Sequence, residues 1–481
     1  MQNNFFPKKL NLNDFDYELP ENKIALFPNE KREQSKLLVF ESSYKENTVI
    51  DGRMQYAPTV GAYCIRPSRN DSKITHSSFD KICDFIPENS LVILNSTKVI
   101  PARFAMKKES GGVVELLLTE PIFPSQDPQI TISSNSPTVW ECIVGGRKIL
   151  ENTILTPIGH MQCATTSPQF NDSRGKVCSP IENNTEWQAN PAPTRNAGVL
   201  NLKAFIKKRY ENKATVEFSW QPENFSFAEV LELLGKIPLP PYIKREVSEI
   251  DKNRYQTVYA KIAGSVAAPT AGLHFSENIF SDFKNKNIEI AEVVLNVGPG
   301  TFVPIETEIN FHQMHSEQIF VSKKTIEMLS ENYLKEKSFT VATGTTSLRT
   351  LETLYWFGVR LLREDFDVEN FDNSSGFFLE QNYPYLTKMD FTVEETFSIL
   401  VDFLNKKNID LLHLRTQLFI VPSYKIRTAN ALITNFHLPK STLLLLVSAF
   451  VGTENCKNIY SSALENNYKF LSYGDSSLLK I

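Results

Sequence analysis

The stretch NALITNFHLPKSTLLLLVSAF, residues 430–450, decides the fold class because it holds a strand, a turn and a helix in sequence. Its first part, 430–436, is a short apolar run of the length expected for a buried strand. A polar turn follows, in which Ser441 or Thr442 is placed to cap the next element. The apolar run 442–452 is too short to span a bilayer, so we interpret it as a buried helix. A strand, turn and helix of this kind are typical of an α/β layer.

The same alternation runs through the second half of the chain. Apolar strands are expected at 288–297 and 339–344, in addition to 430–436. Helical stretches separate or follow them, at 323–337, 346–360, 393–407, 441–451 and 456–470. This pattern predicts an α/β core, a mixed sheet with flanking helices.

The first half has a different texture, with short β-branched runs separated by Gly, Pro, Asn and Ser. The runs are LVILN, VIPARFAM, GGVVELLLTE, VWECIVG and ATVEFSW. Short strands at this spacing are typical of a small barrel or sandwich. We therefore expect an antiparallel β-barrel at 93–241, inserted between core segments at 1–92 and 242–481. We interpret the polar segment 44–75 as a surface excursion, 164–198 as a long loop or a partly disordered segment, and 360–392 as an insertion.

Composition narrows the class of protein. The 481 residues carry a formal charge of −4, which argues against a uniformly basic nucleic-acid binder. Six scattered cysteines without a C-x-x-C pair favour reduced thiols over a disulfide framework or a zinc site. The first residues contain no long apolar stretch of the signal-peptide type. We expect a soluble, cytoplasmic protein that does not contact membranes.

Two loops carry polar groups where strands give way to helices. ATGTTSLRTLE places Gly344, Thr345 and Thr346 at a helix N-terminus, where anionic groups bind well. The alternative is ordinary helix capping by Thr and Ser. The second loop places Asn435 and His437 after a strand, and ligands of open α/β sheets bind at such strand ends.

Small residues are concentrated in the second part of the stretch RYQTVYAKIAGSVAAPTAGLHF, residues 254–275. After bulky side chains at its start, Gly, Ser, Ala and Thr predominate, and His274 stands next to its last residue. Small residues permit close approach of a backbone, either to a ligand or to a neighbouring strand. We favour a ligand, with Ser265 and Thr270 in the loop that contacts it. Packing against a strand is the alternative.

Two further groups of residues are considered, one as a metal site and the other as a nucleic-acid contact. His312 and His315 could share one helical face, but without a third ligand we expect hydrogen-bonding roles and no metal. Basic residues on or beside the expected barrel could follow a phosphate backbone, with a solvated charged surface as the alternative. These basic residues are Lys98, Arg103, Lys107, Lys108, Lys244 and Arg245.

Taken in order, nine stretches resemble the S-adenosylmethionine:tRNA ribosyltransferase-isomerases of queuosine biosynthesis. They are FDYELPENKIALFPNEKREQSKLLVF, LVILNSTKVIPAR, PLPPYIKR, RYQTVYAKIAGSVAAPTAGLHF, EVVLNVGPGTF, MHSEQIFV, TGTTSLRTLE, TANALITNFHLPKSTLLLLVSAF and NNYKFLSYGDSSLL. The resemblance covers nearly the whole chain apart from about 44–75, 121–200 and 360–392. The sequence departs from the usual family pattern at LRTQLFIVP, 414–422, and in the two serines after Asp475.

The resemblance implies a reaction on tRNA. The ribosyl part of S-adenosylmethionine is attached to the 7-aminomethyl-7-deazaguanine at the wobble position and rearranged, giving epoxyqueuosine-tRNA, adenine and methionine. S-adenosylmethionine would be a consumed co-substrate, and no metal or redox cofactor is implied. A base must remove a proton next to the sulfonium, and an acid must protonate the departing adenine.

Histidines and a tuned acid are the natural groups for this chemistry. We expect His274, His437 and His315 to be catalytic, with Asp475 as an acidic partner. Arg349 or Lys440 could hold the methionine carboxylate, and aromatic residues near Arg254 could contact a base. The expected substrate-binding residues are Arg254, Tyr255, Gln256, Ser265, Thr270, Gly344, Thr345, Thr346, Arg349, Asn435, Lys440 and Thr442.

Two alternatives remain open at this stage. A non-catalytic RNA-binding protein would keep the basic barrel but would have little use for polar clusters at several strand ends. A transferase acting on small molecules would keep those clusters and ignore tRNA, so salt-sensitive tRNA binding argues against it. We expect a monomer.

Overall fold

A computed structural model describes residues 10–42, 72–146, 149–158, 200–302, 304–387 and 391–481. The chain forms two compact units. One unit comprises Met1–Ile100 together with Ile237–Ile481, and we call it the core unit. The other comprises Pro101–Lys236, and we call it the barrel unit. The polar segments 44–75 and 164–198 lie wholly or almost wholly outside the described residues.

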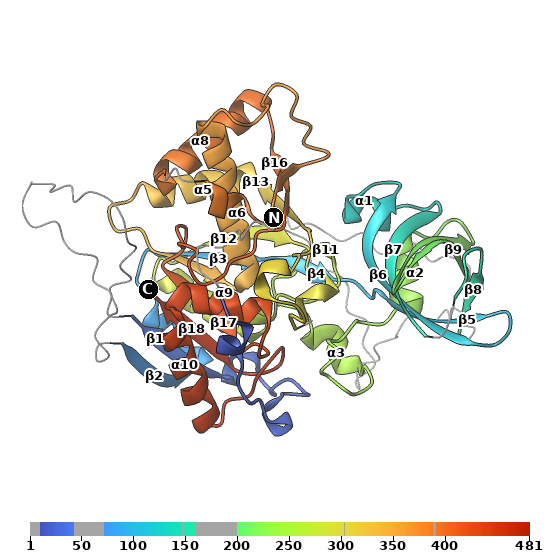
Figure 1. Ribbon diagram of the computed structural model, residues 1–481, viewed down its shortest axis with the longest axis horizontal. Helices are drawn as coiled ribbons and strands as arrows, with labels where there is room; N and C mark the ends of the chain where they lie inside the picture. The colour runs from blue at the N-terminus through green and yellow to red at the C-terminus, as the bar shows by residue number, and fades with distance from the viewer. Residues whose placement is uncertain (1–9, 43–71, 147–148, 159–199, 303, 388–390) are drawn as a thin grey trace, which may run out of the picture. The chain divides into compact units, whose positions relative to one another are not determined.

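The core unit is built on one ten-stranded mixed sheet (Figure 1). Four neighbouring strands at its centre, β12, β3, β14 and β17, are parallel, so their carboxyl ends lie along one edge. In spatial order the strands are β15 (Phe377–Leu379), β16 (Leu411–Thr416), β13 (Glu317–Ser322), β12 (Glu289–Leu295), β3 (Leu91–Asn95), β14 (Thr340–Thr343), β17 (Ala431–Asn435), β18 (Ser476–Lys480), β1 (Lys36–Glu41) and β2 (Lys73–Ser78).

The strand LVILN, which we assigned to the barrel, is β3 at the centre of this sheet. All five of its residues are buried, and it pairs in parallel with β12 and β14. A strand covered on both faces has a continuous apolar sequence, and that pattern alone does not tell which sheet it joins. The barrel unit accordingly begins at Pro101 and ends at Lys236, where we had expected 93 and 241.

Helices cover both faces of the sheet, as the alternation of its side chains requires. Ile93, Ala342 and Leu432 point into one core cluster, whereas their neighbours in sequence point into the other. The first face is covered by α5 (Lys323–Tyr333), α6 (Thr345–Leu362), α8 (Val393–Lys407), α9 (Thr442–Val451) and α10 (Thr453–Glu465). The second is covered by the 3₁₀ segment η4 (Phe79–Phe85) and α4 (Glu277–Asn285).

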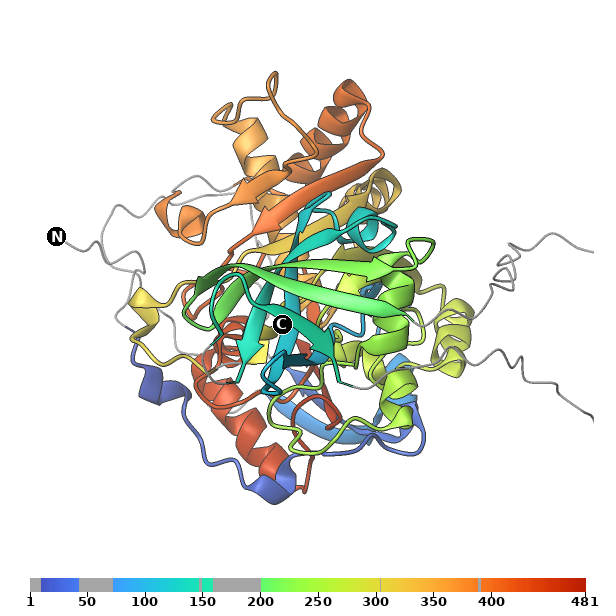
Figure 2. The same ribbon diagram turned by 90° about the vertical axis from the view of Figure 1, so that its right-hand side faces the viewer.

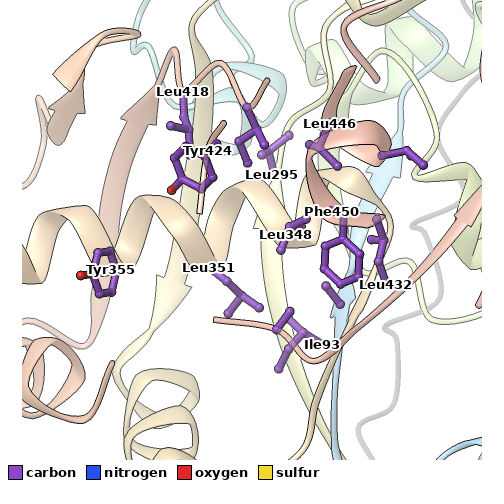
Figure 3. Close-up of a cluster of buried hydrophobic side chains, with 14 of the residues drawn as sticks. Ile93, Leu295, Leu348, Leu351, Tyr355, Leu418, Tyr424, Leu432, Leu446 and Phe450 are labelled. Atoms are coloured by element: carbon purple, nitrogen blue, oxygen red, sulfur yellow. The ribbon is translucent and has the colours of Figure 1, made fainter. Parts of the chain in front are cut away.

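Helix α6 is the best-buried helix of the core unit. Its Leu348 and Leu351 pack among Ile93, Leu432 and Phe450, as Figure 3 shows. This packing fixes the axis of α6, and therefore the position of its first turn, at the carboxyl edge of β14.

Most of the predicted helices and strands of the core are confirmed within a few residues. The clearest difference is α10, which ends at Glu465 where we expected 470, because the chain turns at Asn466 to return to the sheet. The segment 360–392, which we interpreted as an insertion, contains edge strand β15 and helix α7 (Tyr383–Leu386). Strands β13, β16 and β18 were not predicted.

The barrel unit is a closed antiparallel barrel of six strands in the order β10-β7-β6-β5-β8-β9, coloured cyan to green in Figure 2. Phe227 of helix α2 closes it by stacking on Trp220 and contacting Trp140 and Phe218. The elements are β5 (Arg103–Lys108), β6 (Val113–Phe123), α1 (Pro128–Ile132), β7 (Thr138–Gly145), β8 (Ile154–Pro157), β9 (Asn201–Tyr210), β10 (Lys213–Gln221) and α2 (Phe227–Leu234). The predicted fold class is therefore confirmed.

Shorter elements of the core unit carry most of the polar residues discussed below. They are η1 (Leu12–Phe15), η2 (Glu21–Lys23), η3 (Arg32–Gln34), β4 (Thr97–Val99), α3 (Glu249–Arg254), β11 (Ile262–Ser265), η5 (Thr270–His274), η6 (Pro299–Phe302) and η7 (Ile309–Phe311). Strands β4 and β11 pair with each other. Among the described helices, none is long and apolar enough to cross a membrane.

Candidate active site

A cleft of about 350 Å³ lies at the carboxyl end of β17. We call it the first cleft. Its wall combines backbone and apolar surface with a small set of polar side chains, among them Thr270, Thr301, Asn435, His437 and Ser441. A concave site with a few convergent polar groups at this edge of an α/β sheet is where ligands of such folds bind.

His274 and Asn435 are hydrogen-bonded to each other in the wall between two clefts. The Asn435 amide donates from Nδ2 to the carbonyl of Leu471 at 3.0 Å and to that of Ser472 at 3.3 Å, so its Oδ1 must be the atom that faces His274 Nε2 at 3.2 Å. The imidazole therefore carries its proton on Nε2. Its Nδ1 then accepts from Ser35 Oγ at 2.7 Å.

Burial keeps this imidazole neutral. The His274 side chain is 4% exposed. Removal from water lowers its pKa from 6.5 to about 4, an effect that the hydrogen bond to Asn435 only partly opposes. With both nitrogens engaged, His274 is held as a fixed, uncharged part of the wall.

His437 differs because one of its ring nitrogens is not engaged. Its Nε2 lies 2.8 Å from Thr434 Oγ1, while its backbone is held by the hydroxyls of Tyr460 and Tyr17. Among the described residues, Nδ1 has no hydrogen-bond partner, and the ring lines the first cleft. Burial lowers the pKa of His437 to about 3, so this ring is also neutral.

A second cleft of about 270 Å³ lies on the other side of His274. Ser472 lines both clefts. Two cations line the second cleft and are fixed by carbonyl groups. Arg254 donates to the carbonyls of Glu30 and Asn29, and Arg32 donates to those of Leu273 and Asn253. Arg254, which we expected to bind substrate, thus lines a cleft, and so does Arg32, to which the sequence analysis assigned no role.

The first turn of α6 adjoins the same region. Gly344 has a positive φ of 88°, and its N–H donates to the carbonyl of Ile433 on β17. A Cβ at Gly344 would lie 3.6 Å from that of Ala271 in η5, so the two segments are in contact. Thr345 and Thr346 are buried there.

The small residues of 254–275 are mostly packed against protein. Ser265 is fully buried, donates to the carbonyl of Ala267 at 2.8 Å and accepts from the N–H of Val297 at 2.9 Å. A Cβ at Gly272 would lie 2.0 Å from the Tyr259 hydroxyl, so the ring of Tyr259 requires this glycine. These contacts favour the packing alternative for the segment, of which Thr270 and His274 line the clefts.

Residues near Arg254 also have structural partners. Tyr255 is completely buried against Tyr473, so its ring offers no face to a nucleobase. Gln256 bridges the backbone of Val99 through both ends of its amide. Neither residue lines either cleft.

Asp475 joins two backbone segments. Its two carboxylate oxygens accept from the N–H groups of Lys36 and Lys469, each at 2.7 Å. Desolvation raises its pKa despite these bonds. The preceding Gly474 lines the second cleft, so Asp475 positions the wall of that cleft from behind.

The remaining predicted residues lie near the first cleft without lining it. Lys440 pairs with Asp16 at 2.8 Å in a half-exposed site. Thr442 opens α9, but Ser441 is the residue that caps the helix and lines the cleft. His315 is exposed and packs on Gly300, next to Thr301.

The basic residues are divided between the two units. Arg103, Lys107 and Lys108 lie on β5 of the barrel unit, whereas Lys98, Lys244 and Arg245 belong to the core unit. Several have acidic partners: Arg103 pairs with Glu115, Lys244 with Glu21 and Arg245 with the buried Asp251. Among the described residues, Lys98 and Lys107 have no carboxylate partner.

Comparison with known proteins shows the family to which the chain belongs. A family model described as queuosine biosynthesis protein matches residues 64–479. The chain belongs to this family. It is 33% identical over 472 residues to the S-adenosylmethionine:tRNA ribosyltransferase-isomerase of Thermosipho melanesiensis, covering 98% of this chain and 100% of that relative. The enzyme of the same name from Natranaerobius thermophilus is 32% identical over 474 residues, covering 98% of this chain and all of that protein.

A solved structure of the same kind also matches. The crystal structure of S-adenosylmethionine tRNA ribosyltransferase from Thermotoga maritima is 23% identical and covers 97% of this chain and 99% of that one, with a TM-score of 0.40. The predicted family is confirmed, and the protein is an enzyme of the transferase-isomerase type.

Family membership also shows what sequence reasoning missed. Thr301 and Glu317 lie in stretches that carry the resemblance, GPGTF and MHSE, yet neither received a role. Ser35 and Arg32 lie in the N-terminal stretch and were equally unassigned. Their position in motifs shared with the family was the available signal, but a motif does not say which of its residues meet in space.

Proposed function

We propose that the protein transfers the ribosyl moiety of S-adenosylmethionine to the 7-aminomethyl-7-deazaguanine at the wobble position of tRNA. The sugar is isomerised in the process, giving epoxyqueuosine-tRNA with release of adenine and methionine. S-adenosylmethionine is consumed as a co-substrate, and no other cofactor takes part. The protein acts as a monomer in the cytoplasm.

The observation that carries this proposal is the first cleft with the open nitrogen of His437. The polar groups of this cleft are mainly neutral donors and acceptors, from Asn435, Thr270 and Ser441. Uncharged groups suit a sulfonium substrate, because they neither repel its positive charge nor attack the carbons attached to sulfur.

We assign the proton transfer next to sulfur to His437. Its neutral Nδ1 accepts the proton from the ribose carbon, and the electron pair left behind forms an ylide with the sulfonium. The proton carries one positive charge from the ribose carbon to the imidazole, and the carbanion left beside the sulfonium makes a neutral ylide, so the net charge of the enclosed site is unchanged. His274 and Asn435 act as positioning residues for the wall of the cleft.

The tRNA would be attracted by basic side chains that have no carboxylate partner among the described residues. Lys107 of the barrel unit and Lys98 of the core unit are both exposed on strands. A modest number of phosphate contacts suits a protein whose total charge is −4. The wobble base sits in a loop, so presenting it costs less than extracting a paired base.

A turnover assay tests the proposal. The protein is mixed with S-adenosylmethionine and an anticodon stem-loop carrying the aminomethyl deazaguanine, and adenine is measured by chromatography. We expect adenine release that depends on the modified base, together with a mass gain on the RNA. Absence of adenine from folded protein and intact substrates would refute the reaction.

Histidine variants then test the assignment. His437→Ala should lower kcat by about 10²- to 10⁴-fold, the usual contribution of a general base. His76→Gln is the matched control, because His76 lies on β2, contacts Tyr468 and Ser462, and lines neither cleft. A His437→Ala enzyme with wild-type kcat would overturn the role of this residue and leave the overall reaction standing.

A further inference from the structure

A buried ion pair joins α6 to strand β13 beside the first cleft. Arg349 lies in the second turn of α6, and Glu317 is the first residue of β13. Arg349 Nη1 donates to Glu317 Oε2, and the two side chains are only 7% and 6% exposed. Burying two charges costs several kcal/mol for each ion, so such a pair is retained only when its surroundings or its function offset that cost.

The pair is unusual because the guanidinium uses only part of its hydrogen-bonding capacity. Nε donates to the carbonyl of Leu418 at 3.2 Å, and Nη1 donates to Glu317. Nη2 is buried and has no hydrogen-bond partner among the described residues. A buried donor left without a partner costs about 1–3 kcal/mol. Arg–carboxylate pairs frequently form two parallel N–H···O hydrogen bonds, whereas among the described residues Arg349 donates one to Glu317.

The carboxylate has spare capacity as well. Within the part of the chain that the structure describes, Glu317 Oε1 accepts only a long contact of 3.5 Å from Thr301 Oγ1. Thr301 lines the first cleft, so this hydroxyl links the buried pair to the wall of the site. A donor and an acceptor of opposite charge therefore lie side by side, one residue away from the cleft.

We propose that Arg349 and Glu317 bind the amino-acid end of the methionine part of S-adenosylmethionine. Arg349 Nη2 donates to the α-carboxylate, and Glu317 Oε1 accepts from the α-ammonium group. This inference rests on the function proposed above and assigns the part of the substrate that does not react. Because a zwitterion brings one charge of each sign, it adds no net charge to the enclosed pair.

Lys440, the other predicted anchor for the carboxylate, fits less well. Its ammonium group is half-exposed and already pairs with Asp16 at 2.8 Å. An exposed ion pair is screened by water and contributes little. The enclosed guanidinium with a free Nη2 is the stronger carboxylate ligand.

Two thioether ligands distinguish contacts to the amino-acid group from contacts to the rest of the substrate. S-adenosylhomocysteine carries the amino-acid group and methylthioadenosine lacks it, while both keep the adenosine and a neutral sulfur. Calorimetry without tRNA gives Kd for both ligands with wild type, Arg349→Lys and Glu317→Gln. We expect S-adenosylhomocysteine to bind each variant about 10- to 100-fold more weakly, as loss of a charge-assisted hydrogen bond implies. Methylthioadenosine should bind within about threefold of wild type, which also demonstrates that the site is folded.

The matched controls are Arg360→Lys and Glu380→Gln, the two partners of an ion pair farther along α6. They should leave both affinities unchanged. Equal weakening of both ligands by Arg349→Lys and Glu317→Gln, or weakening of neither, would overturn the proposed contacts. If wild type binds neither thioether and releases no adenine, the proposed function itself fails, which is a separate result.

Discussion

Replacing His274 by glutamine should make the protein less sensitive to acid. In the wild type, His274 Nε2 donates to Asn435 and Nδ1 accepts from Ser35, so the buried ring is neutral. A glutamine amide can donate to Asn435 and accept from Ser35 in the same way, but it does not titrate. The substitution therefore removes one protonation equilibrium and keeps the hydrogen-bonding pattern.

The magnitude follows from the pKa of the buried ring. Burial lowers the pKa of His274 from 6.5 in the unfolded chain to about 4 in the folded protein. Because the unfolded state takes up the proton first, the stabilising contribution is complete above pH 6.5 and is lost as the pH falls towards 4. Between about pH 7.5 and pH 5 the loss is about 2 kcal/mol, since each pKa unit corresponds to about 1.4 kcal/mol. His437 adds a similar loss in both proteins, because burial lowers its pKa to about 3.

Urea unfolding at about pH 7.5 and pH 5 measures the effect. The wild-type free energy of unfolding should fall by about 2 kcal/mol more than that of His274→Gln over this interval. Any constant difference between the two proteins cancels, because only the change with pH is compared. Equal losses in the two proteins would refute the reasoning, since they would mean that His274 titrates alike in the folded and unfolded states.

Three further predictions concern the fold and the tRNA contact. Gly474→Ala should lower the free energy of unfolding, measured in urea, by about 1–3 kcal/mol, because the added Cβ would lie 2.5 Å from backbone atoms. Gly298 faces open space, so Gly298→Ala should change the free energy of unfolding little. Tyr424→Phe should cost about 1–3 kcal/mol in the same assay, because the indole N–H of Trp356 loses its acceptor and Oε2 of the buried Glu352 loses the hydroxyl donor. Lys107→Ala should lower the slope of log affinity for tRNA against log salt by about 1, as measured by titrations at several salt concentrations.

Much of the core fold could be predicted because its helices and strands have recognisable local sequence patterns. The helix at 393–407 has apolar residues at helical spacing and a capping box between Thr392 and Glu395, and it was predicted with both ends correct. The strand LVILN is equally clear as a strand, but its sheet could not be predicted. A mostly apolar run fits any buried sheet, and the residues of β12 and β14 that pair with Leu91 lie 198 and 249 residues away in sequence.

Some of the residues that line the two clefts were singled out from the sequence, but their contacts could not be predicted. His274 is hydrogen-bonded to Asn435 and Ser35, which lie 161 and 239 residues away in the chain. No local sequence pattern indicates that residues so far apart in the chain are in contact. Tyr255 shows the converse error, since an aromatic residue in a motif can serve packing as well as stacking, and only the structure reveals its burial.

Burial of the two histidines and the charge of the proposed substrate are physically connected. An exposed histidine is partly protonated near neutral pH, and a protonated imidazole beside a sulfonium would repel it and could accept no proton. Burial lowers the pKa of His274 and His437 far enough to keep both rings neutral. The cations lining the second cleft, Arg32 and Arg254, are in turn fixed by backbone carbonyls. The fold therefore separates neutral side chains at the first cleft from cationic side chains at the second. This separation leaves the first cleft with uncharged acceptors for a cationic ligand.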